Sequence, residues 1–125
     1  MPNYLDLTKA QFQSLNALPD DGPISMLNLL KFKDKVESSG KTGAEHYKEY
    51  LKAAYPYFTK VNAKIVFQGS PKLTLIGPEA NEWDKVLIVE YSAKADFIKM
   101  ITSPGYPAKM RSEALLDSRL IFCKT

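Results

Sequence analysis

Two segments of the chain, Ile24–Phe32 and Lys85–Tyr91, carry apolar side chains at both sets of alternating positions. A strand that exposes one face to water alternates apolar and polar residues, because successive side chains point to opposite faces. These two segments are therefore predicted to be strands that are covered on both faces.

Two helices are predicted from start signals that precede apolar residues at helical spacing. The first, expected over Thr8–Leu18, begins with a Thr-x-x-Gln capping box. The second begins at a Thr-x-x-Glu box over 42–45, and its apolar residues recur as far as Val61. A kink or break is expected near Tyr55, because Pro56 lacks a backbone donor.

The rest of the chain supplies three more strand-like segments, one more helix and a helical turn. These are strands at Lys64–Gly69, Leu73–Ile76 and Ser118–Lys124, a helix capped by Ser92, and a helical turn over Ala108–Leu116. Pro71 lies between the first two of these strands, and proline belongs at a sheet edge or bulge. This arm is therefore predicted at the edge of the sheet.

After the leading helix, the order of elements is strand, helix, strand, strand, helix, strand. This order predicts a ferredoxin-like α+β fold, in which a four-stranded antiparallel sheet carries two helices on one face. The first and third strands are central in such a sheet. The length fits one domain over residues 1–125, with an N-terminal helix and turn over 1–22 and the β-α-β-β-α-β core over 23–125.

The second face of the predicted sheet needs a cover, because both central strands are apolar on both sides. The simplest cover is the same sheet from a second copy of the chain, which would form a barrel across a homodimer. The leading helix is the alternative cover. We expect the homodimer.

Composition narrows the classes of partner and site. Lys and Arg number 17 against 14 Asp and Glu, a net charge of +3 without a dense basic stripe, so no nucleic-acid partner is expected. Cys123 is the only cysteine, which excludes an intrachain disulfide and a multi-thiolate metal site. No apolar run approaches the roughly 20 residues of a membrane span, and no signal peptide is recognised. We expect a cytoplasmic protein without a membrane partner.

Asn28 and Arg111 are the residues whose positions most suggest a site. Asn28 lies among apolar residues of the first central strand, where its amide either orients a small molecule or is a satisfied buried group that fixes strand register. Arg111 follows the Pro-Gly-Tyr-Pro break of 104–107. Its guanidinium either clamps a carboxylate or enolate, or pairs with Glu90 or Glu113.

His46 is the only histidine and lies in the charged first turn of the second helix, so an exposed position is expected. One histidine without aligned partners supplies neither a metal site nor a Ser-His-Asp relay. No phosphate-binding loop, zinc-binding or nucleophile-elbow motif occurs. No metal and no cofactor are predicted.

Several stretches together resemble domain-of-unknown-function family 1330 across Pro23 to Ile121. They are Met26–Phe32, Leu75–Pro78, Trp83–Asp84 with Leu87–Tyr91, Ser103–Tyr106 and Asp117–Ile121. That family belongs to the dimeric α/β-barrel superfamily, which includes cofactor-independent monooxygenases, small-molecule isomerases and haem-degrading proteins. The resemblance implies a dimer with a ligand cleft between the sheet and the helices of each protomer.

Carried over to this chain, the resemblance puts Asn28 in the cleft, with Trp83, Tyr91, Tyr106 and Arg111 around it. The family commonly has a His-Arg pair where this chain has Met110 followed by arginine, so a histidine role at that place is absent here. Our hypothesis is a metal-free protein that binds or transforms a small anionic or aromatic organic molecule. If it is an enzyme, it would be monooxygenase-like or isomerase-like. The alternatives are a non-catalytic dimeric binding or stress-associated protein, and a haem-binding or haem-degrading protein.

Overall fold

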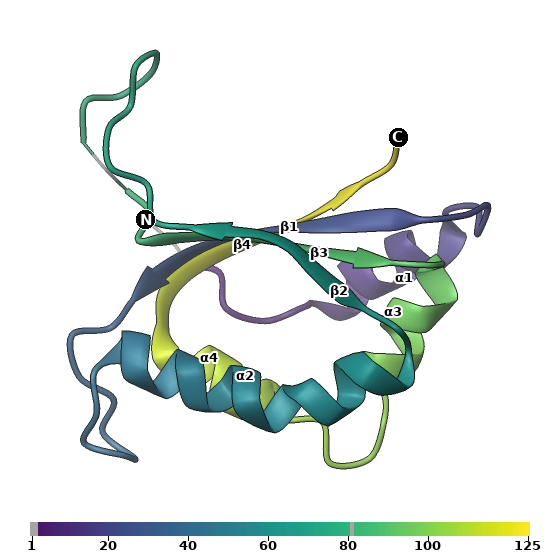
Figure 1. The fold of residues 1–125 in the computed structure, drawn as a ribbon, viewed down its shortest axis with the longest axis horizontal. Helices are drawn as coiled ribbons and strands as arrows, with labels where there is room; N and C mark the ends of the chain where they lie inside the picture. Colours follow the sequence, from purple (N-terminus) through teal and green to yellow (C-terminus); the bar gives the residue numbers. More distant parts are fainter. Residues whose placement is uncertain (1–2, 81) are drawn as a thin grey trace.

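A computed structural model describes residues 3–80 and 82–125 as four helices and a four-stranded antiparallel sheet (Figure 1). The elements are α1 (Lys9–Ala17), β1 (Ile24–Phe32), α2 (Gly43–Lys60), β2 (Lys64–Gly69), β3 (Lys85–Tyr91), α3 (Lys94–Ile101), α4 (Ala108–Ala114) and β4 (Leu115–Cys123). The strand order is β2-β3-β1-β4, so the first and third strands are central. The ferredoxin-like prediction is confirmed.

The helices lie on one face of the sheet (Figure 1). In β1, the side chains that face the helices are buried at Ile24, Met26, Asn28 and Leu30, and the intervening ones are half-buried. The leading helix α1 lies on the helix side, because Leu15 packs in the same core as these strand residues. It does not cover the second face, so this alternative to the dimer is wrong.

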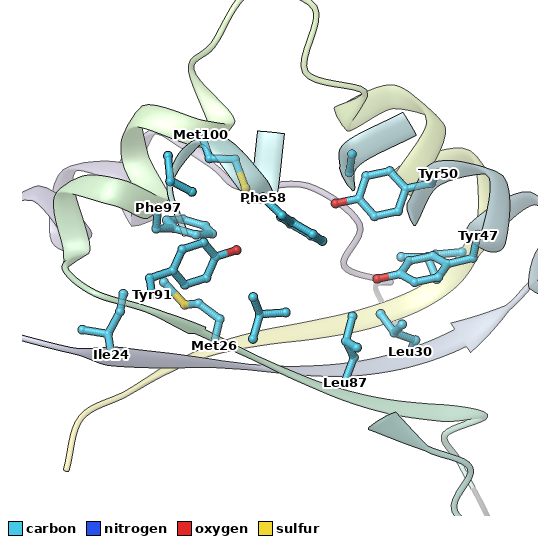
Figure 2. Packing of buried hydrophobic residues seen from close by; sticks show 14 of the residues in the cluster. Ile24, Met26, Leu30, Tyr47, Tyr50, Phe58, Leu87, Tyr91, Phe97 and Met100 are labelled. Atoms are coloured by element: carbon cyan, nitrogen blue, oxygen red, sulfur yellow. The ribbon is translucent and has the colours of Figure 1, made fainter. Parts of the chain in front are cut away.

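The core fills the layer between the sheet and the helices (Figure 2). Helix α2 contributes Tyr47, Tyr50, Ala54 and Phe58 to it. The helix continues through Pro56, so the break expected near Tyr55 does not occur. Buried residues precede and follow the proline, and their packing against the sheet holds the helix together across the missing hydrogen bond.

Backbone hydrogen bonds join the start of α2 to the residue after β1, and that residue to the end of α4. Gly43 N donates to Lys33 O at 2.9 Å, and Lys33 N donates to Ala114 O at 3.0 Å. A Cβ atom at Gly43 would lie 2.5–2.6 Å from these backbone atoms, so only glycine fits. This close contact sets the distance between α2 and α4, and therefore the distance between the tyrosines of α2 and the side chains of α4.

Two local predictions are wrong. Leu73–Ile76 forms no strand in the described structure, because β3 already pairs with β2 over Lys64–Gly69 and the following residues leave the sheet as an extended arm (Figure 1). Ser92 does not cap α3, whose first residue is Lys94. The Lys94 backbone N–H instead donates to Asp20 Oδ1 at 3.1 Å, a cap from the turn after α1 that local sequence does not indicate.

His46 is buried, with 6% of its surface exposed, so the prediction of an exposed histidine is also wrong. Its Nδ1 lies 3.0 Å from Ser39 Oγ and its Nε2 lies 3.5 Å from Glu113 Oε1 of α4. The charged first turn of α2 therefore faces α4 and the loop that precedes α2. This packing is tertiary and cannot be read from the neighbouring residues alone.

Candidate functional site

A cavity of about 280 Å³ lies between the sheet and the helices. Its lining comes from β1, β3, β4, α2, α3, α4, Tyr106 between α3 and α4, and the N-terminal residues 5–7. Apolar walls come from residues such as Phe58, Val89 and Met100, and the polar groups are Asn28, Arg111, Ser112, Asp6 and several tyrosines. An apolar cavity with a few convergent polar groups is the usual form of a small-molecule site.

Asn28 and Arg111 meet in this cavity. Arg111 Nη2 donates a hydrogen bond to Asn28 Oδ1 at 2.9 Å. The Asn28 amide nitrogen donates to Leu87 O at 3.2 Å, and more weakly to Met26 O at 3.4 Å. The amide of this central strand residue is therefore satisfied by the protein and orients the guanidinium.

Arg111 has no ion-pair partner among residues 3–80 and 82–125. Glu113 faces the opposite way, toward His46. Glu90 is exposed and pairs in register with Ser25, on the sheet face away from the helices. The expected alternative, a pair with Glu90 or Glu113, is wrong, and the guanidinium keeps an unneutralised charge at the cavity.

Four tyrosines surround the same space. Figure 2 shows the hydroxyl groups of Tyr47, Tyr50 and Tyr91 pointing toward one region beside Phe58. The hydroxyl of Tyr106 forms a short hydrogen bond of 2.5 Å with that of Tyr50, and the two rings meet edge to face. One of these two hydroxyls donates to the other, so the pair keeps one proton free for a ligand.

Burial raises the pKa of all four tyrosines above the ordinary value. For Tyr106 the pKa rises to about 12. The charge of Arg111 lowers each pKa, but by less than burial raises it. The four hydroxyls therefore remain neutral at physiological pH and serve as hydrogen-bond donors.

The polar side of the cavity consequently offers mostly donors. Arg111 has donors beyond the one used by Asn28, and a guanidinium cannot accept. The only carboxyl group among the described lining residues is that of Asp6, whose Oδ1 already accepts from Ser112 Oγ. Such a lining suits an oxygen-rich anion and supplies no strong base.

Trp83 lies outside this cavity, while the other residues suggested by sequence line it. Its ring packs on the guanidinium of Arg119, 5.2 Å from the ring centroid, and Tyr4 lies 4.8 Å from the same group. Sequence reasoning missed Tyr47 and Tyr50 as site residues. Their i, i+3 spacing on one face of a predicted helix was the available signal.

In the described ranges, no group of three or more His, Cys, Asp or Glu side chains is placed to hold a metal ion. The only histidine, His46, is not a lining residue of the cavity. Across the same ranges no helix is both long and apolar enough to cross a membrane.

No family model matches the chain, so the resemblance to family 1330 is not confirmed, and no curated protein matches either. The solved structures do include similar proteins. The RPA0582 protein of Rhodopseudomonas palustris, described as of unknown function, is 39% identical, with a TM-score of 0.89, over 99% of this chain and 98% of that one. The methylated form of RPA0582 is 40% identical, with a TM-score of 0.91, over 100% and 96%.

More distant structures share the fold alone. A dimeric protein of unknown function with a ferredoxin-like fold from Bacteroides fragilis is 17% identical, with a TM-score of 0.55, over 86% of this chain and 100% of that one. The N63A mutant of SnoaB, a cofactor-independent oxygenase from Streptomyces nogalater, is 16% identical, with a TM-score of 0.52, over 82% and 92%. These likenesses agree with the observed sheet order and say nothing of the chemistry in the cavity.

Proposed function

Because this chain belongs to the family of the RPA0582 protein of Rhodopseudomonas palustris, whose own function is unknown, we propose a function from the cavity itself: it binds a small organic anion between the sheet and the helices. Arg111 holds the anionic oxygens, the tyrosine hydroxyls donate to them, and the apolar walls hold the carbon skeleton. Asn28 acts as a positioning residue, because its amide oxygen fixes the guanidinium.

The observation that carries this proposal is the unpaired charge of Arg111. A partly buried cation without a carboxylate beside it is costly unless a partner arrives, because burial removes the water that would otherwise stabilise the charge. A bound carboxylate, enolate or phenolate would supply that partner through charge-assisted hydrogen bonds. A cationic or donor-rich ligand would meet the guanidinium and neutral hydroxyls, and would be rejected.

The size of the cavity limits the ligand. An engineered apolar cavity of about 150 Å³ binds a benzene ring, and the cavity here is about 280 Å³. A substituted single ring, or an aliphatic acid of similar size, fits this space. Haem is a poorer candidate, because the cavity offers no histidine to its iron.

The test compares two substitutions on α4 that keep or remove charge. Arg111→Lys keeps the charge but loses the planar fork that holds two oxygens at once. We expect it to weaken binding of benzoate, phenylacetate and salicylate by at least about tenfold, or 1.4 kcal/mol. Lys109→Gln removes a positive charge from an exposed position of the same helix and is the matched control. Isothermal titration measures the affinities, and thermal unfolding checks the fold.

A loss of affinity in Lys109→Gln without a loss in Arg111→Lys would mean that only the overall charge matters, and the site at Arg111 would be rejected. A lower melting temperature for Arg111→Lys, with unchanged affinity for the acids, would make the arginine structural. Haemin and a neutral amide such as benzamide complete the panel. Tighter binding of benzamide than of benzoate would contradict an anion site.

We also infer a homodimer in which the exposed sheet faces of two copies meet. Support comes from the half-buried apolar residues of that face, which include Leu27, Leu29, Val86 and Ile88. The arm after β2 adds side chains that are largely exposed: Leu73 at 76%, Leu75 at 87% and Ile76 at 97%. Exposed apolar side chains of this number are typical of an interface. The Bacteroides fragilis protein with the same fold is described as dimeric.

A further inference from the structure

A second cavity of about 790 Å³ lies beside the first, between α1 and the sheet. Its walls are mainly aliphatic and aromatic, with Leu7, Leu15 and Leu18 from the α1 region and Met26, Leu120 and Phe122 from β1 and β4. Arg111 and Met26 line both cavities. The two spaces therefore meet at the guanidinium.

Helix α1 lies over this space without filling it. Only Leu15 is buried along the helix, and Leu7 and Leu18 at its two ends remain 46% and 42% exposed. Lys94 holds the C-terminal end of α1 by hydrogen bonds: its Nζ donates to the carbonyl groups of Asn16 and Leu18. A helix held at its end over an unfilled apolar space leaves room for an apolar group beneath it.

Several polar side chains of the second cavity are already bonded within the protein. The Asp6 carboxylate accepts from Ser112, and Arg119 pairs with Asp117 at 2.8 Å. Of the two arginines that line this cavity, Arg111 is the one without an ion-pair partner among the described residues, and it lies where the second cavity joins the first. The combination favours a molecule with an anionic head at the guanidinium and an uncharged tail that continues under α1.

We propose that the ligand is an amphipathic acid whose unbranched alkyl tail occupies the cavity beneath α1. The proposal rests on the anion site described above, because the head is held by Arg111. It adds a tail site between the sheet and α1, a helix that precedes the β-α-β-β-α-β core. The space also limits tail length, because methylene groups gain affinity only while they enter the cavity.

A series of straight-chain carboxylates from butanoate to dodecanoate tests the tail site. Each methylene group moved from water into an apolar cavity stabilises binding by about 0.8 kcal/mol, which is about fourfold in Kd. We expect this increment over the first several members, followed by a plateau when the cavity is full. Isothermal titration below the critical micelle concentration measures the series.

Two tryptophan substitutions on α1 then locate the tail. Ser14 is exposed but lines the second cavity, and Gln13 beside it is exposed and does not line it. Ser14→Trp should fill part of the space and reduce the gain per methylene group to less than about twofold, while butanoate affinity stays the same. Gln13→Trp introduces the same side chain on the same helix and should behave as the unmodified protein.

The outcomes separate this proposal from the anion site. Short acids that bind through Arg111 with no gain from longer tails would overturn the tail site and leave the anion site standing. The same would follow if Ser14→Trp kept the full gain per methylene group. If Arg111→Lys bound butanoate and benzoate as tightly as the unmodified protein, the anion site itself would fail.

Discussion

Asn28 Oδ1 accepts a hydrogen bond of 2.9 Å from Arg111 Nη2, which joins the centre of the sheet to α4 across 83 residues of sequence. The amide nitrogen is used at the same time by the carbonyl group of Leu87 on the neighbouring strand. The asparagine is thus fixed by the sheet and in turn fixes the arginine. Its two suggested roles, a satisfied amide and a site residue, are compatible, because it satisfies its own bonds and positions the group that would meet a ligand.

Asn28→Asp should convert this neutral contact into an ion pair within the cavity. The new carboxylate would lie against the guanidinium and neutralise the charge that an anionic ligand needs. We expect the affinity for benzoate at neutral pH to decrease by at least about tenfold. Isothermal titration measures the effect.

Asn28→Ser is the control for this substitution, because it removes the amide without adding a charge. It should weaken benzoate less than Asn28→Asp does. If the aspartate variant bound benzoate as tightly as the unmodified protein, anions would not approach Arg111 and the proposed site would be incorrect.

The sheet order was predictable because the apolar pattern of single strands reports their position. Ile24–Phe32 and Lys85–Tyr91 are apolar on both faces, and they are the central strands. Leu73–Ile76 has the same local character, but β2 already occupies the side of β3 that β1 leaves open, and the segment after β2 leaves the sheet. Strand propensity describes which residues tolerate an extended chain, whereas pairing depends on available neighbours.

The site was predictable only in part for a related reason. Asn28 and Arg111 were visible as polar residues among apolar ones. Tyr47 and Tyr50 looked like ordinary core residues of an amphipathic helix, because a sequence does not show where a hydroxyl group points. The burial of His46 depends on Glu113 and Ser39, which tertiary packing brings to it.

His46→Ala should destabilise the fold, contrary to what the sequence alone suggests. The substitution removes a buried ring and its hydrogen bond to Ser39, and leaves Glu113 without the adjacent imidazole. We expect the free energy of unfolding to decrease by about 1–3 kcal/mol. Urea unfolding followed by circular dichroism measures it, with Lys48→Ala as a control at an exposed position of the same helix. Equal stability of the two variants would show that the buried contacts contribute nothing.

The buried tyrosines predict a loss of stability at alkaline pH. Burial raises the pKa values of Tyr47, Tyr50, Tyr91 and Tyr106, the last to about 12. The unfolded chain releases these protons near the ordinary value of about 10, so above that pH the folded state binds more protons. The free energy of unfolding should therefore be unaffected by these groups below about pH 10 and should decrease as the pH rises toward and beyond 12.

Urea unfolding at several pH values measures this decrease, and the absorbance of tyrosinate reports ionisation directly. Tyr91→Phe should make the decrease less steep, because one buried hydroxyl group no longer titrates. Tyr55→Phe, at a position 68% exposed, is the matched control and should leave the slope closer to that of the unmodified protein. If the native protein ionised all its tyrosines near pH 10, the hydroxyl groups would not be held neutral in the cavity.

Ile88→Glu should separate the proposed dimer into monomers. Ile88 pairs in register with Leu27 on the sheet face away from the helices, next to Phe67 of β2, which is 53% exposed in the isolated chain. A glutamate there would be solvated in a monomer but buried without a partner between two sheets, and an unpaired buried charge is strongly unfavourable. Light scattering at micromolar concentration should give about twice the chain mass for the unmodified protein and the chain mass for the variant.

Tyr55→Glu places the same charge on the outer side of α2 and should remain dimeric. A monomeric unmodified protein would contradict the proposed sheet-to-sheet dimer.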